Sequence, residues 1–358
     1  MIDPKRYTSG RIAVINLSAT IEGLELRRAG GAPVEDLLVL SKLLFVRGDL
    51  LGRIADHDQA EWVALEAVAS FPDAPRSLFI RAQLAERFHR FSEAQTLLDR
   101  ASAAGHPDRE IDAERAALLQ ATGHYLQALS LRSRLAKEDA GIHTLGALGS
   151  LLAEMGSWSA AEAAYRAALD ADTGVSPLPC GQLLFEWAVG AMRRHELERA
   201  EAIFAELDAI LPQHVPGRGH RAEVALARGQ VEDAMTLILP LIAFSDDPEY
   251  GATYAEILAA RGERQAAARQ AESAAAAYEL LLARRPEAYA DHAAAFYMGI
   301  GDRPWRAVEL ARFNRRLRDT PRSRRLMSRA RRAAIAAEAR TSCPGQGGHM
   351  RGPVEKIA

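Results

Sequence analysis

The residues whose types could do chemistry gather in the C-terminal half of the sequence. His220 and Glu223 are three positions apart, which places both on one face of a helix that contains them. Asp291 and His292 are adjacent, and Glu256 stands between the two pairs. If the fold brings these five residues together, the resulting His/Glu/Asp cluster could hold a divalent metal or an ammonium-bearing ligand. It could also act as a general acid and base.

A simpler interpretation of the His/Glu/Asp cluster is a solvated polar surface, in which the histidines bond to neighbouring carboxylates. No recognised metal motif accompanies these residues, so the polar surface is the favoured interpretation. Metal binding by His220, Glu223, Glu256 and His292 is the weaker alternative. The sequence identifies no catalytic residue and no cofactor, and we therefore expect none.

A second charged feature is a run of arginines near the C-terminus. Between Arg312 and Arg332 there are ten arginines and one acid, Asp319. We predict a patch for an anionic or acidic partner there, or a basic end that meets the acidic groove of another molecule. The simpler alternative is a solvated end helix. No aromatic residues interleave the run, which makes nucleic acid an unlikely partner. The predicted patch comprises Arg312, Arg315, Arg316, Arg322, Arg324 and Arg325.

The composition limits the fold and the compartment. Hydrophobic residues make up 48% of the 358 residues but aromatic residues only 6%, so alanine and leucine must do most of the packing, as in closely apposed helices. The two cysteines carry no metal or disulfide spacing. No signal pattern and no long apolar run is present. We expect a cytoplasmic protein without a membrane span.

The elements that must position these residues repeat along the chain. Short polar breaks separate helical patterns at intervals of 34, 34, 33, 39, 34, 33 and 39 residues. A 34-residue period matches a helix–turn–helix unit. The breaks are Ala55-Asp56, His89-Arg90, Gly123-His124, Gly156-Ser157, His195-Glu196, Gly229-Gln230, Gly262-Glu263 and Gly301-Asp302.

Two columns of small residues share this period. Every unit has Gly or Ala seven positions before its break and Ala five positions after it, with the last Ala one place late. Two helices can cross closely only where their side chains are small, so the columns predict the helix contacts. The first column is Gly48, Ala82, Ala116, Gly149, Ala188, Ala222, Ala255 and Ala294. The second is Ala60, Ala94, Ala128, Ala161, Ala200, Ala234, Ala267 and Ala307.

These patterns resemble the tetratricopeptide repeat family. The fourth unit is nearest to the family pattern, with Leu145-Gly146-Ala147-Leu148-Gly149 followed by Gly156, Trp158, Ala161 and Tyr165. The resemblance covers roughly residues 36–321. It implies an all-α, right-handed superhelical solenoid of about eight helical hairpins. It also implies a protein–protein or peptide-binding scaffold, because stacked hairpins present one long concave surface.

The predicted organisation has four parts. Residues 1–33 form an N-terminal arm, either a packing helix or partly disordered, and residues 34–321 form the repeat array. Residues 322–339 form a basic capping helix, and residues 340–358, rich in Gly and Pro, form a disordered tail. One long spacing indicates a loop over 172–179, and the other an overlong second helix ending near Arg285-Pro286.

In this family the first helix of each hairpin lines the concave side. That position places Glu186 and the His/Glu/Asp cluster in the groove, where they are candidate ligand-binding residues. The leading hypothesis is a groove that captures a protein or peptide segment without catalysis. The alternative is a small-ligand or metal-binding protein, with hydrolytic or transfer activity, centred on the His/Glu/Asp cluster. A third is the helical sensor arm of a signalling complex.

Overall fold

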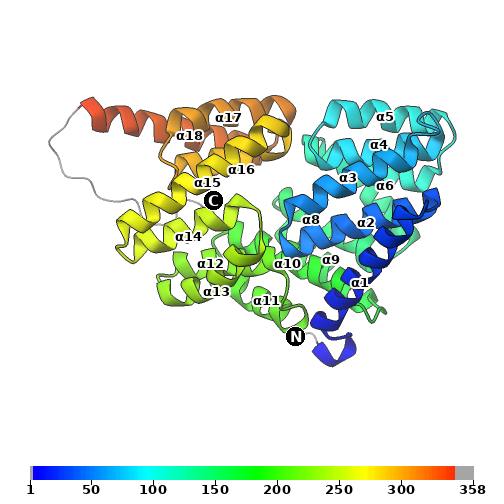
Figure 1. The fold of residues 1–358 in the computed structure, drawn as a ribbon, viewed down its shortest axis with the longest axis horizontal. Coiled ribbons are helices and arrows are strands. Elements are labelled where there is room, and N and C mark those ends of the chain that lie inside the picture. The colour runs from blue at the N-terminus through cyan, green and yellow to red at the C-terminus, as the bar shows by residue number, and fades with distance from the viewer. Residues whose placement is uncertain (1–2, 343–358) are drawn as a thin grey trace.

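The computed structural model describes residues 3–342, which form one short 3-10 turn, eighteen α-helices and no strand (Figure 1). The turn is Pro4–Arg6 and the helices are α1 Gly10–Ala29, α2 Val34–Leu51, α3 Ile54–Val68, α4 Pro75–Arg87, α5 Phe91–Ala103, α6 Asp108–Thr122, α7 Tyr125–Glu138, α8 Ile142–Glu154, α9 Trp158–Ala171, α10 Pro177–Arg193, α11 Leu197–Ile210, α12 Val215–Ala227, α13 Val231–Phe244, α14 Pro248–Ala260, α15 Arg264–Arg284, α16 Pro286–Met298, α17 Pro304–Leu317 and α18 Pro321–Ser342. Over these residues the fold is the predicted all-α helical-repeat solenoid.

Helices α2 to α17 pair in sequence order into eight hairpins within this part of the chain. The small residues of both predicted columns are buried, and Ala188, Ala222 and Ala294 have no exposed surface. At Gly149 an added Cβ would lie 2.8 Å from the Tyr165 ring of the second helix. The two helices of a hairpin therefore approach each other as closely as the two columns of small residues predicted.

A left-handed residue ends the first helix of each hairpin in the described chain. Five are glycines, where positive φ costs little, and the others are His89, His195 and Asp302. The first of the predicted breaks was wrong by three residues. Gly52, with φ 59°, ends α2, and α3 begins at Ile54 rather than after Ala55-Asp56. The Ala55-Asp56 pair, predicted as the break, lies on the first turn of α3, where Asp56 pairs with Arg47.

The N-terminal segment packs as a helix across two distant parts of the solenoid. Leu17, Ile21 and Leu24 of α1 are buried in the core that α2 shares with α10 and α11. Ahead of α1, Tyr7 Oη donates to Asp172 Oδ2 over 2.9 Å. The loop before α10 therefore contacts the N-terminal arm and holds it against the solenoid.

The other end of the array is closed by α18, which packs against α16 and α17. It begins with a reciprocal cap, in which the Thr320 and Ser323 hydroxyl groups each accept the other residue's backbone N–H. The predicted overlong helix is α15, which has 21 residues and ends at Arg284. The predicted disordered tail lies mostly outside the described residues.

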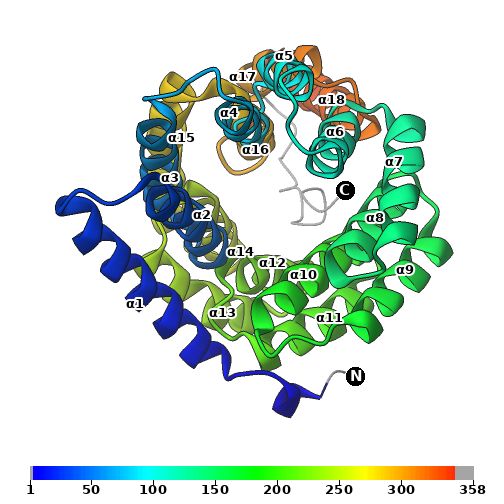
Figure 2. The same cartoon turned by 90° about the vertical axis from the view of Figure 1, so that its right-hand side faces the viewer.

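The hairpins wind into a ring, with the first helix of each hairpin on the inner side and the second on the outer side (Figure 2). After about one turn the C-terminal hairpins lie beside the N-terminal ones, so that α2 packs near α12. We call the contacts between these two levels the inter-turn seam.

One part of the seam joins α3 to the loop before α14. The Asp246 carboxylate accepts hydrogen bonds from the backbone N–H groups of Ile54 (2.6 Å) and Ala55 (2.9 Å). Ser245 Oγ donates to the carbonyl oxygen of Gly52. The start of α3 is therefore capped by a residue almost two hundred positions away in sequence.

A second part of the seam is ionic and aromatic. The Arg285 guanidinium lies 2.8 Å from Asp58 and 2.7 Å from Glu61, and its centre lies 3.8 Å from the centroid of the Phe88 ring. His89 Nδ1 lies 3.1 Å from the carbonyl oxygen of Glu287. These contacts tie the first two hairpins to the last two.

None of the helices that the structure describes combines the length and the apolar character needed to cross a bilayer.

Candidate functional site

The inner face of the ring carries most of the predicted site residues. Helices α10, α12, α14 and α16 lie on the inner side of the ring (Figure 2), and they bear Glu186, the His220–Glu223 pair, Glu256 and the Asp291–His292 pair respectively. The order of the helices therefore places these residues along neighbouring stretches of one surface. Their side-chain contacts decide whether they form one site.

His220 and Glu223 form a closed local pair on α12. The His220 Nδ1 and Glu223 Oε2 atoms are 2.9 Å apart, as their i, i+3 spacing predicted. Thr253 Oγ1 donates to the other Glu223 oxygen over 3.2 Å. The His220 ring stacks on Phe185 with a centroid distance of 5.6 Å. Glu223 is only 8% exposed, so its carboxylate is held inside the packing between α12 and α14.

Asp291 and His292 form ion pairs with residues outside α16. Arg318 donates to Asp291 Oδ2 over 2.7 Å, and His292 Nδ1 lies 3.5 Å from Glu249 Oε2. Burial opposes charge on His292, but Asp291 and Glu249 outweigh it and raise the pKa of His292 to about 9. Burial likewise opposes charge on Asp291, but His292, Arg318 and Arg322 hold its pKa well below the usual range. Both groups are therefore charged at neutral pH.

The contacts of the predicted cluster fall into two groups. His220 is paired with Glu223, and His292 is paired with Glu249 and Asp291. Glu256 is half-buried on α14, close to Gly299. Among residues 3–342 no group of three or more His, Cys, Asp and Glu side chains is arranged to hold a metal ion. The metal alternative at His220, Glu223, Glu256 and His292 therefore gains no support from the described chain.

The predicted arginine patch is also divided. Arg315 and Arg324 lie 3.2 and 2.9 Å from Asp319, at the exposed turn between α17 and α18. Arg322 instead points toward Asp291, with 3.9 Å between the nearest atoms. Arg316 lies over the Phe313 ring, while Arg312 and Arg325 are exposed. The six arginines therefore have different neighbours.

Arg322 acts electrostatically on Arg193, an arginine of the inner helix α10. Arg322 and burial lower the pKa of Arg193, on α10, to about 10, while Glu154 and Asp291 act in the opposite direction. The start of α18 therefore faces the end of α10. We call Arg193, Arg318 and Arg322 the basic side of the groove.

Sequence reasoning missed an acidic row on the inner helices before α10. Glu86, Glu114 and Glu154 come from α4, α6 and α8, and Glu186 follows on α10. All four act on Arg132, whose pKa burial lowers while the four carboxylates raise it. We call the four glutamates the acidic row. The signal was present, since glutamates recur on successive first helices, but only Glu186 was selected.

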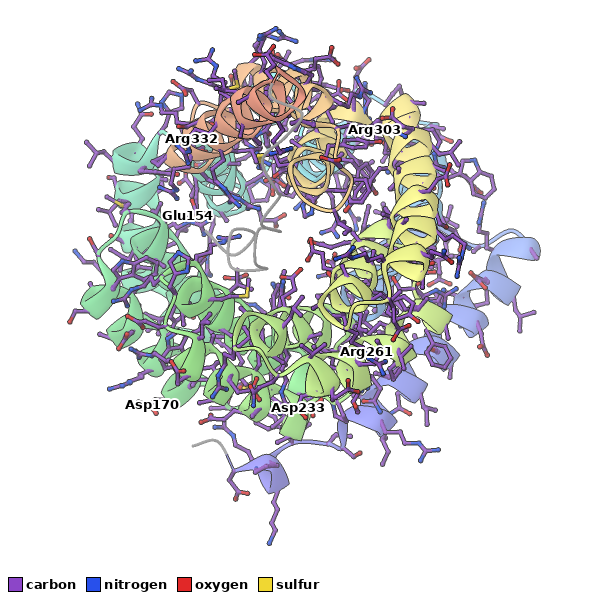
Figure 3. The ribbon with its side chains drawn as sticks, turned by 90° about the vertical axis from the view of Figure 1, so that its left-hand side faces the viewer. Glu154, Asp170, Asp233, Arg261, Arg303 and Arg332 are labelled. Atoms are coloured by element: carbon purple, nitrogen blue, oxygen red, sulfur yellow. The ribbon has the colours of Figure 1, made fainter. Side chains whose placement is uncertain are left out.

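Protein surrounds Glu86, Glu114 and Glu186 of this row, and this shifts their ionisation. Burial raises the pKa of Glu114 to about 7, and the Glu86 carboxylate raises it further. Burial also raises the pKa of Glu86 and Glu186. Gln182 donates to Glu186 over 3.0 Å. Glu154 borders the central opening of the ring, whereas Asp170 lies at its outer rim (Figure 3).

No protein-family model and no curated protein matches the sequence. Among solved structures, a tetratricopeptide repeat protein from Parabacteroides merdae is similar over 67% of this chain and 91% of its own, with 21% identity and a TM-score of 0.44. The TPR domain of P58(IPK) is similar over 90% of this chain and 99% of its own, with 11% identity and a TM-score of 0.25. Yeast Tom70 is similar over 91% and 94%, with 12% identity and a TM-score of 0.28.

The architecture itself rests on the chain's own helix pairs. The described residues form hairpins of about 34 residues, with close contacts at two columns of small residues and a left-handed residue at each turn. The chain is an all-α helical-repeat solenoid of tetratricopeptide-like hairpins.

Proposed function

We propose that this protein is a non-catalytic scaffold that holds an extended protein segment along the inner face of its ring. The observation that carries the proposal is the arrangement of the hairpins, because all eight first helices in the described chain lie on the inner side (Figure 2). A surface built from many equivalent helices offers many shallow contacts along a line, which suits a peptide better than a compact substrate.

The state of the titratable groups supports binding rather than catalysis. A general base must be free to accept a proton from a substrate. His292 is instead held charged by Asp291 and Glu249, and His220 already contacts Glu223. Asp291 is 6% exposed and bonded to Arg318. These contacts hold neighbouring helices in position.

The charges of the groove favour a particular class of segment. The acidic row places four carboxylates near Arg132, and Arg87 and Arg318 also act on Glu86. A segment with lysine or arginine side chains would add cations to this row. The basic side, at Arg193 and Arg322, would accept a carboxylate of the same segment. We therefore expect a segment that is basic along most of its length and acidic at one end.

Peptide binding tests the proposal directly. A library of fluorescent peptides of varied charge is measured by anisotropy against the full chain at low and moderate salt. Basic peptides should bind more tightly than acidic peptides of equal length. The double variant Glu114→Lys/Glu186→Lys should weaken binding about tenfold or more, since it reverses two charges in a confined groove.

The matched control is Asp170→Lys/Asp233→Lys, which makes the same charge change at two exposed positions. Figure 3 places Asp170 at the outer rim, and Asp233 lies on the outer helix α13. The control should bind basic peptides almost as well as the unmodified chain. Equal losses in both double variants, or no preference for basic peptides, would refute the groove assignment.

A further inference from the structure

Two arginine side chains on the basic side of the groove have no hydrogen-bond partner within residues 3–342. Arg193 is the last residue of α10 and is exposed. Arg322 is the second residue of α18, and its side chain is 55% exposed. The nearest atoms of Arg322 and Asp291 are 3.9 Å apart, which is beyond hydrogen-bond distance. The N–H groups of both guanidinium groups are therefore available to a ligand.

The charged groups next to these two arginines are already paired with one another. Arg318 donates to Asp291 Oδ2 over 2.7 Å, and the backbone N–H of His292 donates to Asp291 Oδ1 over 3.1 Å. The charged His292 ring lies 3.5 Å from Glu249. His89 is neutral, because burial and Arg318 lower its pKa to about 4. Two positive charges, those of Arg193 and Arg322, thus remain without a hydrogen-bonded carboxylate.

The two arginines also repel each other. Arg322 is the largest cause of the lowered pKa of Arg193, and Glu154 and Asp291 act in the opposite direction without outweighing it. Glu154 is shared, since it also acts on Arg132 and bonds to the Tyr125 hydroxyl group. An anion between Arg193 and Arg322 would replace this repulsion by two attractive contacts.

We propose that Arg193 and Arg322 together bind the phosphoryl group of a phosphorylated side chain. This inference rests on the proposed function, since it names the acidic end of the segment that the groove holds. A phosphate monoester carries a charge of about −1.5 to −2 at pH 7 and has three strong acceptor oxygens. It can therefore accept hydrogen bonds from two guanidinium groups and match both charges. A carboxylate carries one charge on two oxygens and would leave one of the two positive charges unmatched.

The position of Arg193 on α10 sets the spacing within the segment. Arg193 follows Glu186 of the acidic row by seven residues, which places both on one face of the helix, two turns and about 10 Å apart. In an extended polyproline-type segment, side chains three residues apart lie on the same side and about 9 Å apart. A basic residue that reaches Glu186 therefore lies about three positions from the phosphorylated residue.

Matched peptides test the phosphoryl site. Each fluorescent peptide carries several basic residues and one serine near either end, with the serine free, phosphorylated or replaced by glutamate. Anisotropy against the full chain at fixed salt should show that phosphorylation tightens binding about tenfold or more, because it adds charge-assisted hydrogen bonds. The gain should be largest when the nearest basic residue is three positions from the phosphoserine. Glutamate should give a smaller gain, and an equal gain from glutamate overturns the phosphoryl assignment.

A pair of double variants assigns the gain to the two arginines. Arg193→Gln/Arg322→Gln should abolish most of the gain from phosphorylation, while the free-serine peptide binds at least as tightly as before, because the groove has lost two cations. That retained affinity also shows that the variant is folded. The control is Arg166→Gln/Arg269→Gln, which makes the same charge change at exposed positions of the outer helices α9 and α15. It should keep the full gain.

The outcomes separate this inference from the proposed function. If basic peptides bind but phosphorylation adds nothing, or if the gain survives in Arg193→Gln/Arg322→Gln, the phosphoryl site is wrong and the groove assignment stands. If neither form of any peptide binds, both fail.

Inorganic phosphate distinguishes a free anion from a phosphorylated side chain. Under the proposal, it competes with the phosphorylated peptide and removes the gain, but it leaves the binding of the free-serine peptide unchanged at equal ionic strength. If inorganic phosphate raises the thermal unfolding temperature through the two arginines while phosphorylated peptides show no gain, the site takes a free anion and the proposal is overturned.

Discussion

The carboxylate of Asp246 caps the helix that begins at Ile54. Its two oxygens accept the backbone N–H groups of Ile54 and Ala55 at 2.6 and 2.9 Å. Arg53 occupies the N-cap position of α3, but its side chain accepts no hydrogen bond from the helix. One superhelical level of the solenoid therefore provides the cap for the first hairpin of the other level, which links the stability of α3 to the closure of the ring.

The first prediction concerns this cap. Asp246→Ala should lower the free energy of unfolding by about 0.5–2 kcal/mol, the usual cost of losing a helix cap. Urea denaturation measures the effect, and Asp170→Ala is the control on an exposed outer helix. Small-angle scattering should show a larger radius of gyration if the two levels separate. If both variants have the same midpoint, Asp246 does not stabilise the seam.

The second prediction concerns Arg285 in the same seam. Its side chain is 16% exposed and contacts Asp58, Glu61 and Phe88. Arg285→Ala should cost about 1–3 kcal/mol, because it leaves partly buried carboxylates with fewer partners. Arg284→Ala should cost at most about 0.5 kcal/mol, since Arg284 is 57% exposed and its ion pair is solvated. Comparable losses in thermal unfolding would contradict the role of Arg285.

The third prediction concerns the small columns. Gly149→Ala should destabilise the protein by about 1–3 kcal/mol, because the new methyl group would overlap the Tyr165 ring. Gly251→Ala should instead stabilise it by about 0.5–1 kcal/mol, because the nearest atom is at an ordinary contact distance of 3.8 Å and alanine favours the helix. Chemical denaturation of the two variants compares them. Effects of the same sign would show that the close contact at Gly149 is absent.

The fourth prediction follows from His292. The pKa of His292 is about 9 in the folded chain, above the ordinary histidine value of 6.5. The folded state therefore holds the proton more tightly, and this contribution to stability is complete below about pH 6.5 and disappears as the pH rises through about 9. His292→Gln should be less stable than the unmodified chain at pH 6 and nearly equal to it at pH 9.5.

The control for this variant is His124→Gln, because His124 is exposed. Its stability relative to the unmodified chain should not depend on pH in this way. A stability difference for His292→Gln that stayed constant from pH 6 to 9.5 would mean that the Asp291 and Glu249 carboxylates do not hold the imidazolium.

The fifth prediction links the acidic row to pH. The pKa of Glu114 is raised to about 7, so its carboxyl group is largely protonated at pH 6 and ionised at pH 8. Affinity for basic peptides should therefore rise between pH 6 and 8. Glu114→Gln should remove much of this rise while keeping the shape of the side chain. A pH profile that is unchanged by Glu114→Gln would assign the titration to another group.

Local patterns in the sequence were sufficient for the hairpins. Helix pairs such as α8 and α9 follow from a 34-residue period with Gly149 and Ala161 at fixed places, because two helices can cross closely only at small side chains. The i, i+3 pair of His220 and Glu223 is equally local, since helix geometry alone brings the two side chains together. The first turn was misplaced because the break was predicted at Ala55-Asp56, whereas Gly52 is the residue that adopts the left-handed conformation.

Only the tertiary structure decided which distant groups meet. Each hairpin is rotated slightly against the next, and the sum of these rotations sets where the second level of the ring lies over the first. No local pattern encodes that sum. It pairs Asp246 with the start of α3, brings Arg318 to Asp291 and directs His292 to Glu249 instead of His220. The amino-acid sequence by itself thus determined the repeating unit, and the accumulated superhelical twist determined the chemistry of its inner face.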